Sequence, residues 1–188
     1  MNFLMNKIET AYNFSEYELK VIRYVITAFI YDLSKLIILG VFFYLFGMLP
    51  NFLCALIPFF LLRTKNGGIH TNNYWTCLLM TFLVFIPTVM ILPIYVPLSS
   101  LLRLILMVPC AIIEFGLGPI LSHRKVMLDE KGIRKNRIAS FQVVLIIAIL
   151  IFLFPENTYL LASFWMVIFH AVQLVITKLY KEVKKDEK

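Results

Sequence analysis

Residues 138–154 have the sequence IASFQVVLIIAILIFLF, which contains no charged side chain. An α-helix rises about 1.5 Å per residue, so this stretch nearly spans the roughly 30 Å hydrocarbon core of a bilayer. Similar apolar runs lie at residues 24–46, 49–62, 74–92, 98–120 and 158–177. We therefore predict an all-α fold, a polytopic integral membrane protein with about six hydrophobic helical segments, one of them short.

The composition points to the same class of protein. Of the 188 residues, 61% are hydrophobic and 15% are charged, whereas a soluble domain is about 45–50% apolar. The net charge is +7, but Lys and Arg gather between the apolar runs, as in membrane loops and not as on a nucleic-acid-binding face. We expect a lipid bilayer as partner, no nucleic acid, and a single membrane-embedded domain over residues 1–188.

The start of the chain differs from the apolar runs. It has no continuous apolar core, so it does not resemble a cleavable signal peptide. Polar and apolar residues alternate at helical spacing, which predicts an amphipathic N-terminal segment, residues 1–20, in the membrane interface. A soluble helix packed on the membrane domain is the alternative. Further along, prolines inside three runs predict kinks, at Pro58, Pro87 and Pro109. Run 49–62 is shorter than a full membrane crossing requires, so it either crosses the bilayer or is re-entrant.

The positive-inside rule orients the chain. Six basic residues lie in segment 121–137 and five lysines in the tail 178–188, whereas the connections at 93–97 and 155–157 have no Lys or Arg. Alternating crossings place both termini, both basic segments and the polar link 63–73 in the cytoplasm. The expected location is therefore the cell membrane, with several crossings.

One polar link carries candidate catalytic residues. Residues 63–77 have the sequence RTKNGGIHTNNYWTC. An imidazole can deprotonate a thiol, so His70 and Cys77 suggest nucleophilic catalysis. Cys77 falls near the expected start of a helix, where Thr71, Asn72 or Asn73 can act as cap and the helix dipole favours a thiolate. The alternative is a juxtamembrane histidine and a buried cysteine without catalytic function.

The spacing of the two residues restricts their geometry. On one straight helix, His70 and Cys77 would lie about 10.5 Å apart along the axis, too far for a hydrogen bond. A dyad therefore requires His70 outside the helix, and the conformational freedom of Gly67 and Gly68 allows the chain to fold back. Backbone N–H groups at the helix start are candidates for an oxyanion hole. A dyad shared across a homodimer is the other geometry that satisfies the spacing.

The basic residues around this link have two interpretations. Arg63 can anchor a substrate carboxylate through its planar fork, or it can be a snorkelling interfacial arginine. Four further side chains are candidates for binding an acidic substrate tail, and they also suit topology and attraction to anionic lipid. These residues are Lys65, Lys131, Arg134 and Lys135.

Ionisable and metal-ligating residues elsewhere have mostly structural interpretations. Asp32 and Lys35, three apart, are expected to pair on one helix. Glu114 inside an apolar run suggests a polar groove or a third catalytic residue, as an alternative to ordinary pairing. Packing or interfacial positions are expected for Cys54, Cys110, His123 and His170. No CxxC or HExxH spacing is present, so neither a metal nor another cofactor is predicted.

The pattern R-x3-GG-x-H-x6-C, formed by Arg63, Gly67, Gly68, His70 and Cys77, resembles the accessory gene regulator protein B family (AgrB). Those proteins are bacterial membrane cysteine endopeptidases that mature quorum-sensing peptides. The resemblance implies that Cys77 is the nucleophile and His70 its general base, with Arg63, Gly67 and Gly68 shaping the site. It also implies a short precursor peptide as substrate, which loses its C-terminal tail and becomes a cyclic thiolactone or lactone.

Two other functions suit a chain of this composition. A component of a peptide exporter or permease would use the buried charges and prolines, although the chain shows no internal repeat. A non-catalytic membrane scaffold would need no reactive thiol. The three hypotheses differ in what they require of Cys77.

Overall fold

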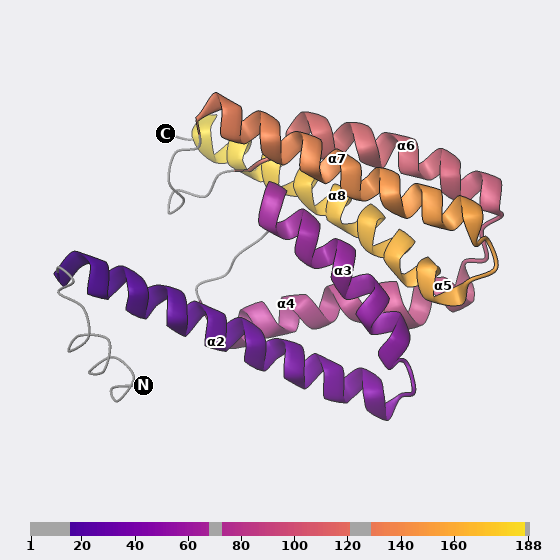
Figure 1. Ribbon diagram of the computed structural model, residues 1–188, viewed down its shortest axis with the longest axis horizontal. Helices are drawn as coiled ribbons and strands as arrows, with labels where there is room; N and C mark the ends of the chain where they lie inside the picture. The colour runs from indigo at the N-terminus through magenta and orange to yellow at the C-terminus, as the bar shows by residue number, and fades with distance from the viewer. Residues whose placement is uncertain (1–15, 68–72, 121–128, 187–188) are drawn as a thin grey trace. The chain divides into compact units, whose positions relative to one another are not determined.

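The computed structural model describes residues 16–67, 73–120 and 129–186 (Figure 1). The chain divides into two compact units, residues Met1–Phe42 and Phe43–Lys188, which we describe separately. Most of the predicted amphipathic N-terminal segment lies outside the described residues.

The first unit contains most of α2, the helix Glu16–Leu45. Within α2, Lys35 Nζ donates a hydrogen bond to Asp32 Oδ1 over 3.0 Å. The Lys35 side chain is 11% exposed and that of Asp32 is 70% exposed. The predicted pairing of these two residues is therefore confirmed.

The second unit is built from helices only. In chain order they are α3 (Leu49–Asn66), α4 (Tyr74–Ile86), η1 (Pro87–Ile91), α5 (Leu92–Tyr95), α6 (Ser100–Leu117), α7 (Glu130–Leu153) and α8 (Thr158–Asp186). The segments α4, η1 and α5 follow one another without a break. Each predicted apolar run corresponds to a helical segment, and the described residues contain no strand, so the predicted all-α fold is confirmed.

Among the described residues, four helical segments are long and apolar enough to cross a membrane. They are Tyr74–Tyr95, Ser100–Leu117, Glu130–Leu153 and Thr158–Tyr180. The protein is a membrane protein with apolar helices. The short helix α3 is not one of the four, and its last turn carries Arg63 and Lys65. The total number of crossings stays a prediction.

Several helices extend beyond the limits of their apolar runs: α2 at its start, α3 and α8 at their ends, and α7 at its start. Helix α3 continues past Leu62 to Asn66, and α7 begins at Glu130, well before Ile138. The expected polar link and basic loop are therefore helical over 63–66 and 130–137. Apolar character marks where a helix meets hydrocarbon, whereas hydrogen bonds and caps mark where it ends. At α7 the Asp129 side chain accepts from the Glu130 N–H over 2.8 Å.

The prolines have different local effects. Pro87 begins the π-helical segment η1, because a proline lacks the N–H that an α-helical bond would need. Pro58 lies inside α3 and Pro109 inside α6, and both helices continue through them. The helix is locally irregular at Pro87, and the kinks expected at the three prolines stay predictions.

The core of the second unit lies where α3, α6, α7 and α8 pack on one another (Figure 1). Apolar side chains of all four helices meet there, among them Leu62, Met107, Ile147 and Phe164. Cys110 belongs to this buried cluster, which confirms its predicted packing position. Aromatic rings join α4 to α3: Phe85 lies 4.9 Å from Phe59 and 5.2 Å from Phe52, measured between ring centroids.

The end of the unit that carries the α7–α8 turn contains a buried arginine. Arg103 is 8% exposed. Its Nε donates to the Leu98 carbonyl over 3.1 Å, and its guanidinium also donates to the Pro155 carbonyl over 3.0 Å. The sequence interpretation overlooked Arg103, whose only signal was its place in the first turn of an apolar run. Because protein carbonyls satisfy this charge, it does not have to reach water.

Candidate active site

Cys77 lies in the first turn of α4, as predicted. The helix begins at Tyr74 after Asn73, whose side chain accepts from the Trp75 N–H over 3.2 Å. Asn73 has extended dihedral angles, φ −100° and ψ 133°, so residues 70 to 77 do not form one continuous helix. A dyad between His70 and Cys77 requires this break. His70 itself lies outside the described residues, so its distance from Cys77 stays a prediction.

The backbone around Cys77 limits where an oxyanion hole can form. The Cys77 N–H donates to the Asn73 carbonyl over 3.0 Å, and the Thr81 hydroxyl donates to the Cys77 carbonyl over 2.8 Å. The Cys77 N–H is therefore occupied by the first bond of the helix. In an α-helix the N–H groups that precede it have no acceptor within the helix, so Thr76 is the backbone donor closest to the thiol in sequence.

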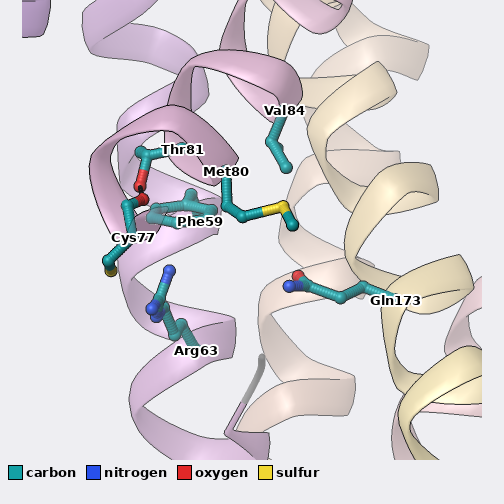
Figure 2. A pocket seen from close by; sticks show the side chains of 7 residues that line it. All are labelled: Phe59, Arg63, Cys77, Met80, Thr81, Val84 and Gln173. Carbon is teal, nitrogen blue, oxygen red and sulfur yellow. Dashed lines mark hydrogen bonds between the residues drawn. The ribbon is translucent and has the colours of Figure 1, made fainter. Parts of the chain in front are cut away.

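Arg63 reaches the same site from another helix. It lies in the last turn of α3, and its guanidinium carbon is 5.2 Å from the centroid of the Phe59 ring. Such a cation–π contact holds the planar fork in one orientation. Figure 2 shows Arg63 from α3, Cys77 from α4 and Gln173 from α8 around one pocket.

This pocket is small. Its volume is about 20 Å³, and Cys77 is only 9% exposed. A volume of about 10–15 Å³ holds one water molecule, so the closed pocket has no room for a peptide. A wider groove of about 220 Å³ between α4 and α8 shares Met80, Val84 and Gln173 with it.

Gly67 has a conformation that only glycine adopts readily. It follows the last residue of α3 with φ 84° and ψ −163°. A Cβ atom at this position would also approach the Ile120 carbonyl oxygen to 3.0 Å. Gly67 thus has the positive φ that glycine freedom allows, whereas Gly68 lies outside the described residues and the predicted folding back of the chain stays a prediction.

A second polar cluster lies at the end of α3. Glu114, predicted as a buried ionisable group, is fully buried and accepts from the side chain of Asn66. His170 Nδ1 lies 2.7 Å from Glu114 Oε1, and His170 Nε2 lies 3.2 Å from the Gly67 carbonyl oxygen. The predicted hydrogen-bonded packing position of His170 is therefore confirmed.

The residues predicted to bind the substrate tail differ in exposure and lie on two different helices. Lys65 is half-buried in the last turn of α3. Lys131, Arg134 and Lys135 are exposed in the first two turns of α7.

Among the described residues, no cluster of His, Cys, Asp and Glu could hold a metal ion. His123 lies outside the described residues.

Sequence reasoning missed two polar residues near the site. Gln173 lines the Cys77 pocket and lies one helical turn after His170 in an apolar run. Asn66 was assigned to a loop, although it ends α3 and is completely buried. For Gln173 the available signal was a polar side chain among apolar neighbours, whereas Asn66 lies in the polar stretch RTKNGG and had no such signal.

Apolar helices around a cysteine in a capped first turn define an α-helical membrane protein with a candidate thiol site. The chain matches the family described as Accessory gene regulator B over residues 1–174, and it belongs to this family. It is also similar to a "Putative AgrB-like protein" of Clostridium beijerinckii, with 24% identity over 147 residues, 78% of this chain and 74% of the relative. No solved structure matches. Membership places the protein in the accessory gene regulator quorum-sensing system, in a family known for peptide processing.

Proposed function

We propose that the protein is a membrane-embedded cysteine endopeptidase that removes the C-terminal tail of a short precursor peptide and closes the rest into a ring. One observation carries the proposal. Cys77 lies in the first turn of α4 and shares a pocket with Arg63, the first residue of the family-like motif, from another helix. Family membership supports the same chemistry.

In the first step the Cys77 sulfur attacks the carbonyl carbon of the scissile peptide bond. His70 takes the thiol proton, and the carbonyl oxygen becomes an oxyanion. We assign the Arg63 guanidinium and the first-turn N–H of Thr76 as the donors to this oxygen. The C–N bond then breaks, His70 returns the proton to the leaving amine, and the rest of the peptide stays on Cys77 as a thioester.

In the second step a thiol or hydroxyl within the bound peptide attacks the thioester carbonyl. Its proton passes to His70, the C–S bond to Cys77 breaks, and the enzyme thiolate is released. The product is a thiolactone when the attacking group is a thiol and a lactone when it is a hydroxyl. A narrow pocket favours this outcome because it limits the access of water to the thioester.

The substrate, the orientation and the assembly belong to the proposal. An acidic peptide tail would be attracted by Lys65, Lys131, Arg134 and Lys135, with both termini and this site in the cytoplasm. The tail is then drawn to the face where the precursor is made. The dyad forms either within one chain or across a homodimer, because both geometries satisfy the spacing of His70 and Cys77.

The permease hypothesis loses part of its support. It drew on the buried charges of the apolar runs, but Glu114 and His170 contact each other and are 0% and 2% exposed. Two side chains satisfied in this way do not line an open path.

The test is cleavage of a synthetic peptide by the purified protein in zwitterionic liposomes. The peptide has an amphipathic start, a central cysteine and an acidic tail. We expect the wild type to release the tail and to form a covalent adduct on Cys77 that mass spectrometry detects. Cys77→Ala should form neither product, and Cys54→Ala, at a half-buried position away from the pocket, should behave as the wild type. Unchanged cleavage by Cys77→Ala would refute the peptidase function.

A further inference from the structure

The structure holds a buried polar network at the end of α3 that the proposed chemistry does not use. Asn66 and Glu114 are both 0% exposed, and His170 is 2% exposed. Three different helices contribute these residues: α3, α6 and α8. A buried polar group without partners costs about 1–3 kcal/mol, so a network in this position needs directional bonds to persist.

The bonds of the network converge on the backbone of residues 66 and 67. The Asn66 Nδ2 donates to Glu114 Oε2 over 2.6 Å and to the Glu114 carbonyl over 2.9 Å. The Asn66 carbonyl accepts from the Ile120 N–H over 2.9 Å. His170 then reaches the Gly67 carbonyl over 3.2 Å.

Proton positions follow from the partners. The Gly67 carbonyl can only accept, so His170 Nε2 carries a hydrogen and donates it. The contact between His170 Nδ1 and Glu114 holds one more hydrogen. This hydrogen lies either on His170 Nδ1, which then faces a Glu114 carboxylate, or on the Glu114 carboxyl, which then faces a neutral imidazole. Both arrangements keep the same contact between the two side chains.

The segment after α6 presses on the network from another side. A Cβ atom at Gly118 would collide with the Asn66 side-chain amide. The Gly118 carbonyl accepts from Arg137 Nε over 2.7 Å, which ties this segment to α7. The end of α3 is therefore in contact with α6, with α8 and with the segment 118–120, which is itself hydrogen-bonded to Arg137 of α7.

We propose that Glu114 and His170 are positioning residues, because their buried contact holds Asn66 and Gly67 and so fixes the end of α3 that carries Arg63 and continues to His70. This inference rests on the proposed peptidase function. Arg63 lies one turn before Gly67, whose N–H donates to the Arg63 carbonyl over 3.0 Å. In the sequence, His70 follows Gly67 by three residues. A displacement at Gly67 would therefore move Arg63 relative to Cys77.

A positioning role predicts a different result from a catalytic role for Glu114. A glutamine at position 114 can donate its amide N–H to His170 Nδ1 and accept from Asn66, while Nε2 stays on Gly67. Glu114→Gln should therefore keep kcat within about threefold of the wild-type value, because it preserves the geometry of the network and a positioning role needs no proton transfer. A leucine of similar volume removes the side-chain bonds to His170 and Asn66 and keeps only the bond from Asn66 to the backbone carbonyl of residue 114. Glu114→Leu should lower kcat by about 100-fold and leave KM within about threefold.

A matched control separates position from packing. The Ser163 hydroxyl donates to the Cys54 carbonyl over 2.7 Å, so it also joins α8 to α3. It lies two turns before His170, about 10.5 Å away along the helix. Ser163→Ala removes a buried bond between the same two helices and should leave kcat and KM unchanged.

The experiment measures kcat and KM for the synthetic precursor on full-length protein in zwitterionic liposomes, with thermal unfolding in detergent for each variant. Wild-type activity in Glu114→Leu would overturn the inference and leave the peptidase function intact. Loss of activity in Glu114→Gln would also overturn it, in favour of a proton-transfer role. Absence of cleavage by the wild type would instead refute the peptidase function.

A second variant covers the case in which Glu114→Leu does not fold. His170→Phe keeps a ring of similar size and removes the donor to Gly67, so the same loss of kcat at constant KM is expected. If neither variant folds, the network serves the stability of the fold, and the positioning role is overturned.

Discussion

The Nε2 atom of His170, on α8, lies 3.2 Å from the carbonyl oxygen of Gly67, which is 103 residues earlier in the chain. Gly67 is thus bonded through its carbonyl to α8 and through its N–H to Arg63. Gly67, a residue of the motif, therefore joins α3 to α8 through its backbone, in addition to having a positive φ. A substitution at position 67 tests how much this conformation contributes to stability.

Gly67→Ala should lower the stability of the folded protein by about 1–3 kcal/mol, because its positive φ is a strained conformation for any other residue. The added Cβ would also press on the Ile120 carbonyl oxygen. Thermal unfolding in detergent measures the effect. Gly116→Ala is the control, since a Cβ there meets nothing within 4 Å and α6 continues through it. Equal stability of the two variants would show that the Gly67 backbone adapts.

The helices of this protein could be predicted from sequence, as could the starts of α3, α4 and α8, but several other ends could not. Apolar runs located each segment because lipid demands a continuous apolar stretch. The ends at Asn66 and Glu130 were missed because polar residues continue a helix when caps and tertiary bonds satisfy it.

The candidate site could be predicted only in its local part. The position of Cys77 in the first turn of a capped helix followed from neighbouring residues. The contacts of Asn66 and His170 with Glu114 join residues 48 and 56 positions apart, and no local pattern reports such distances. Glu114 was noticed because a buried carboxyl in an apolar run demands a partner, although the sequence did not identify that partner.

Cys77 should be the cysteine that iodoacetamide labels first in the folded protein. It lies in the first turn of α4, at the polar edge of an apolar run, and shares a pocket with Arg63, which is the position expected of the proposed nucleophile. Cys110 is buried in the apolar core. Cys54 is half-buried in α3, so it is the stricter comparison. Mapping of adducts by mass spectrometry decides the order, and faster labelling of Cys54 or Cys110 would contradict the assignment of Cys77.

The exposed start of α7 should face the cytoplasm. A single cysteine at Lys131, in a chain whose own cysteines are replaced by alanine, should resist an impermeant thiol reagent in intact cells. It should react after the cells are opened, because Lys131 is exposed on the protein surface. The reason for this orientation is the gathering of Lys and Arg in the expected cytoplasmic segments. Labelling in intact cells would reverse the orientation of α7.

The same basic turns should help to select the substrate. Lys131, Arg134 and Lys135 are exposed side chains near the start of α7. Replacing all three by glutamine removes three positive charges but keeps side chains that suit a helix. If these charges attract an acidic peptide tail, the triple variant should show a higher KM for the synthetic precursor. The rate of Cys77 alkylation should stay unchanged, since the thiol itself is not altered.

Salt dependence distinguishes attraction of the tail from attraction of lipid. Surface charges separated by more than about 8 Å are screened at physiological ionic strength, so the wild-type KM should rise with salt. The triple variant should respond less to salt because it has fewer charges to screen. Zwitterionic liposomes remove anionic lipid as a competing partner. If the triple variant keeps the wild-type KM and the wild-type salt dependence, these residues set topology only. Substrate selection would then depend on contacts at the Arg63 and Cys77 pocket, where a peptide must displace the few side chains that close it.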